Sequence, residues 1–171
     1  SVFYSIEREQ ELLISPEFFI YFSNNNPRVS HIEITLRRGT YLNEMTQFRY
    51  DVILHINKKA QLVPVTWNNY AEKPVLIEDI IFYLTNEKPP IYGLRNIKNL
   101  RLMSLSADVE KIKIAPNDKS VSDIINDSSI TTRMQGTCPE KLATACEELG
   151  YEVKVIASDK YTLEMFDIIC T

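Results

Sequence analysis

The chain has 171 residues, of which 44% are hydrophobic and 25% are charged, and its formal net charge at pH 7 is −4. This length fits one domain or one lobe of a larger domain, and the composition supplies enough apolar residues to bury a core. The negative charge argues against a general nucleic-acid binder, and no apolar run reaches the roughly 18–20 residues of a membrane-spanning helix.

The cysteines and glycines narrow the possible classes of site. The three cysteines are an odd number without metal-ligand spacing, so we expect no metal site and reduced thiols in a cytoplasmic protein. A loop that binds a nucleotide-like cofactor needs closely spaced glycines, so that the backbone can approach the ligand. We expect no such loop in this chain, because its four glycines lie far apart: Gly39, Gly93, Gly136 and Gly150.

The first 30 residues predict two helices and a loop. Residues 1–13 have helical character but no defensible N-cap, as expected for a fragment of a longer chain. In the stretch ISPEFFIYF, Ser15 can cap a helix, Pro16 suits its first position, and Glu17 complements its positive end. The composition of residues 23–30, SNNNPRVS, predicts a loop.

The stretch from His31 to Ile56 predicts two antiparallel strands joined by a long loop. Apolar and polar residues alternate in HIEITLRR and again in FRYDVILHI, which is typical of strands with one buried face. If the strands pair, His31 and His55 become neighbours across the ladder. Polar loops between rigid strands often carry binding or catalytic residues, although most such loops only connect the strands. The loop carries four such candidates: Tyr41, Asn43, Glu44 and Gln47.

The remainder of the chain predicts alternating helices and strands. We expect irregular structure over residues 57–74, a helix over 75–86, and a strand, a turn and a further strand over 91–103. Residues 107–137 predict a loop with one weak helix near 120–126, and Pro139 and Gly150 bound a helix over 139–149. Two closing strands follow. This order predicts a mixed α/β, or α+β, fold.

The segment TLRRGTYLNEMTQFRYDVILHI resembles one part of a known enzyme family. It is similar to the C-terminal part of the S-adenosylmethionine-dependent (N-)methyltransferase domains embedded in nonribosomal peptide synthetases and hybrid polyketide synthases. Those domains carry Lys/Arg-Arg-Gly, a spacer, Asn-Glu-Leu, Thr or Ser, and then Arg-Tyr leading into an apolar strand. The matching residues are 37–39, 43–46 and 49–51, and looser similarity in the same order covers most of the chain.

The resemblance implies a division of the chain. Residues 1–57 would end the methyltransferase core with the last antiparallel strand pair of a class I methyltransferase sheet. Residues 58–171 would form a C-terminal α/β extension. The family's cofactor loop lies in an N-terminal half that these residues do not include. The complete domain would therefore bind S-adenosylmethionine, whereas this chain alone would bind no cofactor and be inactive. The implied partners are that N-terminal half and the adenylation and carrier-protein domains of the same synthetase.

The resemblance also implies site residues for methylation of an amino group. Glu44 could orient the amine and accept its proton, and Asn43 could fix the substrate through its amide. Adjacent side chains on an extended segment point apart, so we expect one of the two, preferentially Glu44, to face the substrate. Tyr50 or Tyr41 would line the pocket, and Arg49 would fix the loop through a carboxylate, with Glu44 or Asp51 as candidates. The alternative is that Asn43 and Glu44 only bond loop backbone.

Two other functions stay open. Many relatives carry His immediately before Asn-Glu, where this chain has Leu42, so any help from that side chain in deprotonation is missing. The lobe could therefore be a non-catalytic structural or docking module within a multidomain synthetase. Methylation of carbon or oxygen in a polyketide context also fits, because Asn-Glu does not select the acceptor atom.

Overall fold

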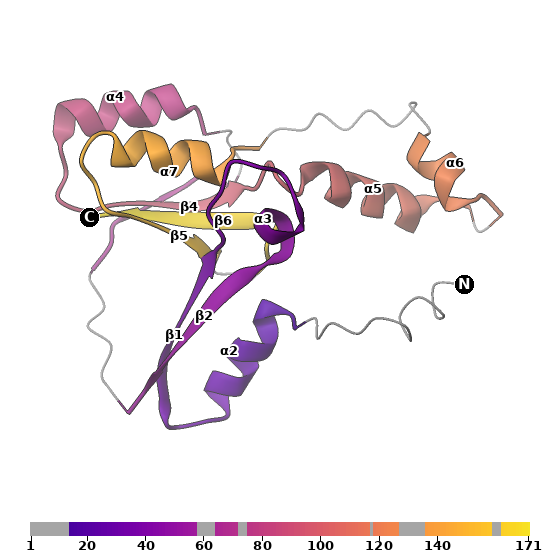
Figure 1. Cartoon of the computed structure of the whole chain (residues 1–171), viewed down its shortest axis with the longest axis horizontal. Helices are drawn as coiled ribbons and strands as arrows, with labels where there is room; N and C mark the ends of the chain where they lie inside the picture. Colours follow the sequence, from indigo (N-terminus) through magenta and orange to yellow (C-terminus); the bar gives the residue numbers. More distant parts are fainter. Residues whose placement is uncertain (1–13, 58–63, 72–74, 117, 127–135, 159–161) are drawn as a thin grey trace.

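The computed structural model describes residues 14–57, 64–71, 75–116, 118–126, 136–158 and 162–171. In these residues six strands form one sheet in the order β2-β1-β5-β6-β4-β3, and all neighbours are antiparallel except β3 and β4 (Figure 1). The predicted mixed α/β class is confirmed. The strands are β1 (Val29–Leu36), β2 (Tyr50–Ile56), β3 (Trp67–Asn69), β4 (Tyr92–Lys98), β5 (Val153–Ala157) and β6 (Met165–Cys170). The helices are α2 (Pro16–Asn24), α3 (Glu44–Phe48), α4 (Ile77–Glu87), α5 (Met103–Ile114), α6 (Val121–Asn126) and α7 (Pro139–Glu147).

The predicted hairpin is confirmed as β1 and β2, which pair antiparallel along both strands. The alternation of apolar and polar residues directs Ile34 and Leu36 into the core, where both are buried. His31 lies opposite His55, and their ring centroids are 5.5 Å apart, as the pairing predicted. Helix α2 packs on β1 and begins as expected, with the Ser15 hydroxyl accepting a hydrogen bond from the backbone N–H of Glu17. The helix predicted over residues 1–13 lies outside the described residues.

The hairpin joins the remaining strands through a narrow junction. In the described part of the chain, Thr35 opposite Ile156 is the single ladder pair between β1 and β5, and Lys154 of β5 adds an ion pair with Glu33 of β1 at 3.2 Å. Figure 1 shows β1 and β2 diverging from the other strands beyond this junction. One sheet therefore contains strands from both sides of the proposed domain boundary after residue 57. Contacts other than strand pairing must position the loop at the end of the hairpin.

The main core lies between the sheet and helices α4 and α7, which cover the same face (Figure 1). Its side chains come from both helices and from the central strands: Leu84, Leu94, Ile97, Leu142, Phe166 and Ile168. Cys146 and Cys170, on α7 and β6, are buried free thiols within this cluster. Among the described residues, no helix is both long and apolar enough to cross a membrane.

Two segments differ from the prediction. β4 ends at Lys98 and the chain then turns into α5. The prediction of a second strand within residues 91–103 is therefore wrong. Helix α5 also replaces the first part of the loop expected from residue 107. Leu105, Val109 and Ile112 follow helical spacing in α5, but the charged and small residues between them resemble a loop composition. Helix α6 confirms the short helix expected near residues 120–126.

Residues 57–74, expected to be irregular, contain the short strand β3. Its three residues pair parallel to β4, and they are too few for an alternating pattern to be recognised in the sequence. Gly93 of β4 makes this approach possible. A Cβ atom there would lie 2.3 Å from Cγ1 of Val65 and 2.9 Å from Cε3 of Trp67.

Removing a core side chain tests this packing. Phe166 is 0% exposed, so Phe166→Ala should lower the free energy of unfolding by about 3–5 kcal/mol. Phe82, on α4, is 73% exposed, and Phe82→Ala should change the free energy of unfolding by no more than about 0.5 kcal/mol. Urea unfolding of both variants measures the difference. Equal losses would contradict the placement of the core.

Candidate functional site

The loop between β1 and β2 contains a short capped helix. Asn43 is the N-cap of α3: its side-chain Oδ1 accepts a hydrogen bond from the backbone N–H of Thr46 at 3.2 Å. In return, Oγ1 of Thr46 accepts from the backbone N–H of Asn43 at 3.2 Å and donates to the carbonyl of Tyr41 at 2.6 Å. Thr46 is buried. The Asn-Glu motif therefore begins a defined turn of helix, which the sequence showed only as a polar loop.

Arg101 binds the backbone of this loop at both ends. Its guanidinium donates from Nη1 to the carbonyl oxygens of Arg37 at 2.8 Å and Thr46 at 3.2 Å, and from Nη2 to that of Gly39 at 2.6 Å. The side chain of Gln47 donates to the carbonyl of Arg101 at 2.8 Å. The Arg101 side chain is 5% exposed. A single buried cation therefore holds the end of β1, the loop and α3 together.

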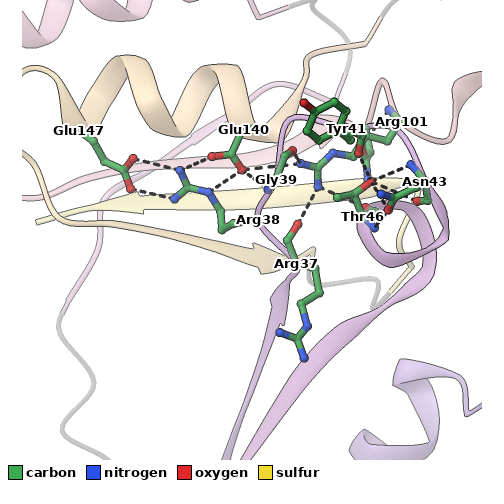
Figure 2. A network of polar contacts seen from close by, with 10 residues as sticks. Arg37, Arg38, Gly39, Tyr41, Asn43, Thr46, Arg101, Glu140 and Glu147 are labelled. Carbon is green, nitrogen blue, oxygen red and sulfur yellow. Dashed lines mark hydrogen bonds and ion pairs between the residues drawn. The ribbon is translucent and has the colours of Figure 1, made fainter.

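Arg38 attaches the same loop to helix α7 (Figure 2). Its Nε and Nη2 donate to the two carboxylate oxygens of Glu140 at 2.9 and 2.8 Å, and its Nη1 donates to Glu147 at 2.8 Å. Oε2 of Glu140 also accepts from the backbone N–H of Gly39 at 2.6 Å. Such charge-assisted, bidentate contacts are geometrically specific.

The charges of this contact shift one another's protonation equilibria. Hydrogen bonds from Arg38 lower the pKa of Glu140 despite its partial burial, and the N–H of Gly39 lowers it further. Hydrogen bonds from Arg38 also lower the pKa of Glu147. The two carboxylates in turn raise the pKa of Arg38. All three groups are therefore charged at neutral pH.

The loop directs its remaining side chains outward. Tyr41 is 82% exposed, and Leu42, Glu44 and Met45 are exposed as well. Among the described residues, the carboxylate of Glu44 has no hydrogen-bond or ion-pair partner. The loop thus has a fixed backbone and exposes a carboxylate and a phenol to solvent.

The other two predicted site residues lie at the base of the loop. Arg49 is the C-cap residue of α3. Tyr50 donates its hydroxyl to the carbonyl of Ile14, its ring packs edge-on against Phe19, and burial raises its pKa. Tyr50 thereby attaches the start of α2 to the hairpin. Asp51, one of the two carboxylates suggested for Arg49, forms an ion pair with Arg37 at 3.0 Å.

Sequence reasoning missed Arg101, Glu140 and Glu147. They lie about 50 to 110 residues from the loop, and only the folded chain brings them to it. One weak signal was available: Arg101 stands among apolar residues in the stretch NLRLM, where a charge must find a partner if it is buried. No comparable signal identifies which carboxylates of α7 face the hairpin.

The glycines do not form a cofactor cradle. Three of them pack against protein, because a Cβ atom would lie within 3.0 Å of neighbouring atoms at Gly39, Gly93 and Gly136. Gly150 ends the turn after α7 with a φ of +93°. These glycines belong to separate parts of the fold, so they form no closely spaced glycine loop. The described residues also contain no cluster of His, Cys, Asp or Glu that could hold a metal ion.

The chain is similar to segments of nonribosomal peptide synthetases. It is 34% identical over 102 residues, 57% of its length, to chondramide synthase cmdD of Chondromyces crocatus. It is 25% identical over 169 residues, 91% of its length, to the beauvericin nonribosomal cyclodepsipeptide synthetase of Gibberella fujikuroi. It is also 36% identical over 56 residues, 33% of its length, to the bassianolide nonribosomal cyclodepsipeptide synthetase of Beauveria bassiana.

This chain corresponds to a small part of each relative. It spans 3%, 5% and 2% of the lengths of these three proteins. No family model matches the chain. The similarity therefore supports an origin in a nonribosomal peptide synthetase. The activities in the relatives' names are those of the complete relatives.

Acid should weaken the contact between the loop and α7. The pKa values of Glu140 and Glu147 are lower in the folded than in the unfolded chain. Their contribution to stability is therefore complete above the ordinary glutamate pKa of about 4.3 and is lost as the pH falls through the folded values. Urea unfolding midpoints measured across this range should fall with acid, and the slope should be smaller in Arg38→Met. Identical slopes would show that Arg38 does not carry this coupling.

Proposed function

We propose that this chain is the C-terminal lobe of an S-adenosylmethionine-dependent methyltransferase domain of a nonribosomal peptide synthetase. The domain would methylate the amino group of an aminoacyl or peptidyl thioester held on a carrier protein. The observation that carries the proposal is the outward carboxylate of Glu44 on a loop whose backbone is fixed by Arg38 and Arg101. A reacting amine must be held in one orientation, and such a loop provides a fixed position for the group that holds it.

In this reaction the lobe would have two tasks, which are to position the acceptor amine and to supply a proton acceptor. Methyl transfer needs a neutral amine in line with the methyl group, which S-adenosylmethionine would supply from the other half of the domain. A carboxylate oxygen of Glu44 would accept a hydrogen bond from the amine and then its proton. Asn43 uses Oδ1 for the helix cap, so its Nδ2 would contact the substrate. Tyr41, which is 82% exposed, belongs to the same loop and would line the acceptor site.

The edge of the sheet supports the proposal that an N-terminal half of the domain packs against this chain. Strand β2 ends the sheet, and among the described residues it pairs with β1 alone. A seven-residue edge strand leaves a row of backbone N–H and C=O groups available for a further strand. Ile53 and Ile56 on this strand are also exposed. We propose that the N-terminal half of the domain covers this edge and carries the cofactor site.

The proposed setting defines the other partners. Adenylation and carrier-protein domains of the same synthetase would deliver the acceptor in the cytoplasm. Residues 1–57 would complete the methyltransferase core, and residues 58–171 would form the extension that supports the loop. The similarity to nonribosomal peptide synthetases supports this setting. The glycine arrangement supports a cofactor site outside this chain.

A non-catalytic docking module is the second candidate, because helix α5 exposes apolar side chains. Leu105, Val109 and Ile112 are all partly exposed at helical spacing, and Figure 1 shows α5 and α6 extending away from the sheet. Such a surface suits contact with a neighbouring domain. Unchanged methylation after loss of the Glu44 carboxylate would favour this candidate.

Glu44→Gln in the complete methyltransferase domain tests the proposed function. Loss of the proton acceptor should lower turnover by about 10²–10⁴-fold, the usual contribution of a general base. Affinity for S-adenosylmethionine should stay unchanged, because the cofactor would bind the other half. Single-turnover transfer of a radiolabelled methyl group and calorimetric titration of the cofactor measure the two quantities.

Glu78→Gln serves as the matched control, because Glu78 is an exposed carboxylate in the first turn of α4. It should retain full turnover. An equal loss of turnover and cofactor affinity in Glu44→Gln would contradict the placement of the loop at the acceptor side of the site.

A further inference from the structure

The loop that presents Glu44 depends on a side chain from a distant part of the chain. Three backbone carbonyls of the loop, those of Arg37, Gly39 and Thr46, accept hydrogen bonds from the guanidinium of Arg101. Figure 2 shows this guanidinium between the end of β1 and the short helix α3. Strand pairing ends at Leu36 opposite Tyr50, and beyond this pair the hydrogen bonds of Arg101 hold the backbone of residues 37, 39 and 46 together.

The geometry requires an arginine. A guanidinium offers five N–H donors in a planar fork, and here Nη1 serves two carbonyls while Nη2 serves a third. The ammonium of a lysine is a point donor that cannot reproduce this arrangement from the same position. Burial of the charge is compensated by the carbonyl dipoles and by Glu140, whose Oε2 lies 3.7 Å from Nη2.

Gly39 is held on both sides by charged groups. Its N–H donates to Glu140, which also binds Arg38, and its carbonyl accepts from Arg101. Its φ is +149°, a backbone conformation that other residues rarely adopt. Both ends of the Gly39 residue are therefore fixed relative to α7 and to the segment before α5. The loop cannot shift without breaking charge-assisted hydrogen bonds.

We infer that Arg101 is a positioning residue for methyl transfer, which sets the place of Glu44 relative to the acceptor amine through the loop backbone. Arg101 itself contacts no reacting atom. This inference rests on the proposed function. It adds that a residue of the C-terminal extension, about 57 residues beyond Glu44 in the sequence, determines the turnover of the domain. A misplacement of about 1 Å at a reacting centre costs on the order of 10²-fold in rate.

The test compares Arg101→Lys and Arg101→Ala with Arg37→Met in the complete domain. Arg37 is the matched control, because its side chain is 49% exposed and forms a surface ion pair with Asp51. Figure 2 shows it pointing away from the loop. The kcat of both Arg101 variants should fall by about 10²-fold. The affinity for S-adenosylmethionine and the KM for the carrier-bound acceptor should each change by no more than about twofold, since neither site is removed.

Rescue separates positioning from general stability. Added guanidinium ion at low concentration should restore part of the kcat of Arg101→Ala, because it can occupy the vacated position and bind the same carbonyls. Methylammonium should not restore it. All assays are run well below the unfolding temperature of each variant. If Arg101→Ala does not fold, the test uses Arg101→Lys, which keeps the positive charge.

Each outcome decides between the two proposals. Turnover of the folded Arg101→Lys variant within about twofold of wild type, in a domain that Glu44→Gln inactivates, overturns the positioning role alone. Full turnover in Glu44→Gln overturns the proposed function of the loop. An equal loss of kcat and cofactor affinity in the Arg101 variants, or a matching loss in Arg37→Met, also overturns the positioning role.

Discussion

A buried guanidinium is the interaction on which the arrangement of this chain depends. Removing a charge from water costs several kcal/mol unless hydrogen bonds and an opposite charge replace the solvent. Arg101 obtains three carbonyl oxygens and Glu140, and in doing so it joins parts of the chain that strand pairing barely connects. The ladder between the hairpin and the other strands consists of one residue pair, Thr35 opposite Ile156, beside the surface ion pair of Glu33 with Lys154. The electrostatic contacts of the loop therefore complete a junction that the sheet leaves narrow.

This constraint links the fold to the proposed chemistry. Most polar groups of the loop are used internally: Asn43 caps α3, Thr46 bonds the loop backbone, and Gly39 bonds Glu140 and Arg101. Glu44 is left with its carboxylate directed outward. A loop that satisfies its own backbone and still presents a carboxylate is preorganised, so little ordering remains to be done when an acceptor arrives. The same rigidity would also suit a docking surface, which is why the test depends on turnover.

The sequence predicted the features that depend on neighbouring residues. Alternation in the stretch before Arg37 and after Arg49 identified β1 and β2, and the facing histidines followed from their register. The cap of α2 at Ser15 was equally local. Helix α5 was missed because its apolar residues point partly to solvent, which leaves no buried stripe to detect. The three-residue strand β3 was too short for any period to be recognised.

The candidate site could be predicted only in part for the same reason. Residues 43 and 44 were selected from a motif, but their different environments, one capping a helix and the other solvated, depend on the backbone path of the loop. Arg101, Glu140 and Glu147 reach the loop through tertiary contacts between distant segments, and no spacing in the sequence encodes these contacts. The motif thus indicated where the candidate site lies, and the structure shows which contacts hold its loop.

We propose that this chain builds the acceptor side of a methyltransferase site and that the cofactor binds in another part of the domain. Calorimetric titration of S-adenosylmethionine into the 171-residue chain, with folding checked by circular dichroism, tests it most directly. We expect the folded chain to show no heat of binding, because its dispersed glycines form no closely spaced loop for a cofactor. Micromolar binding by the folded chain would contradict it, since the cofactor site would then lie within these residues.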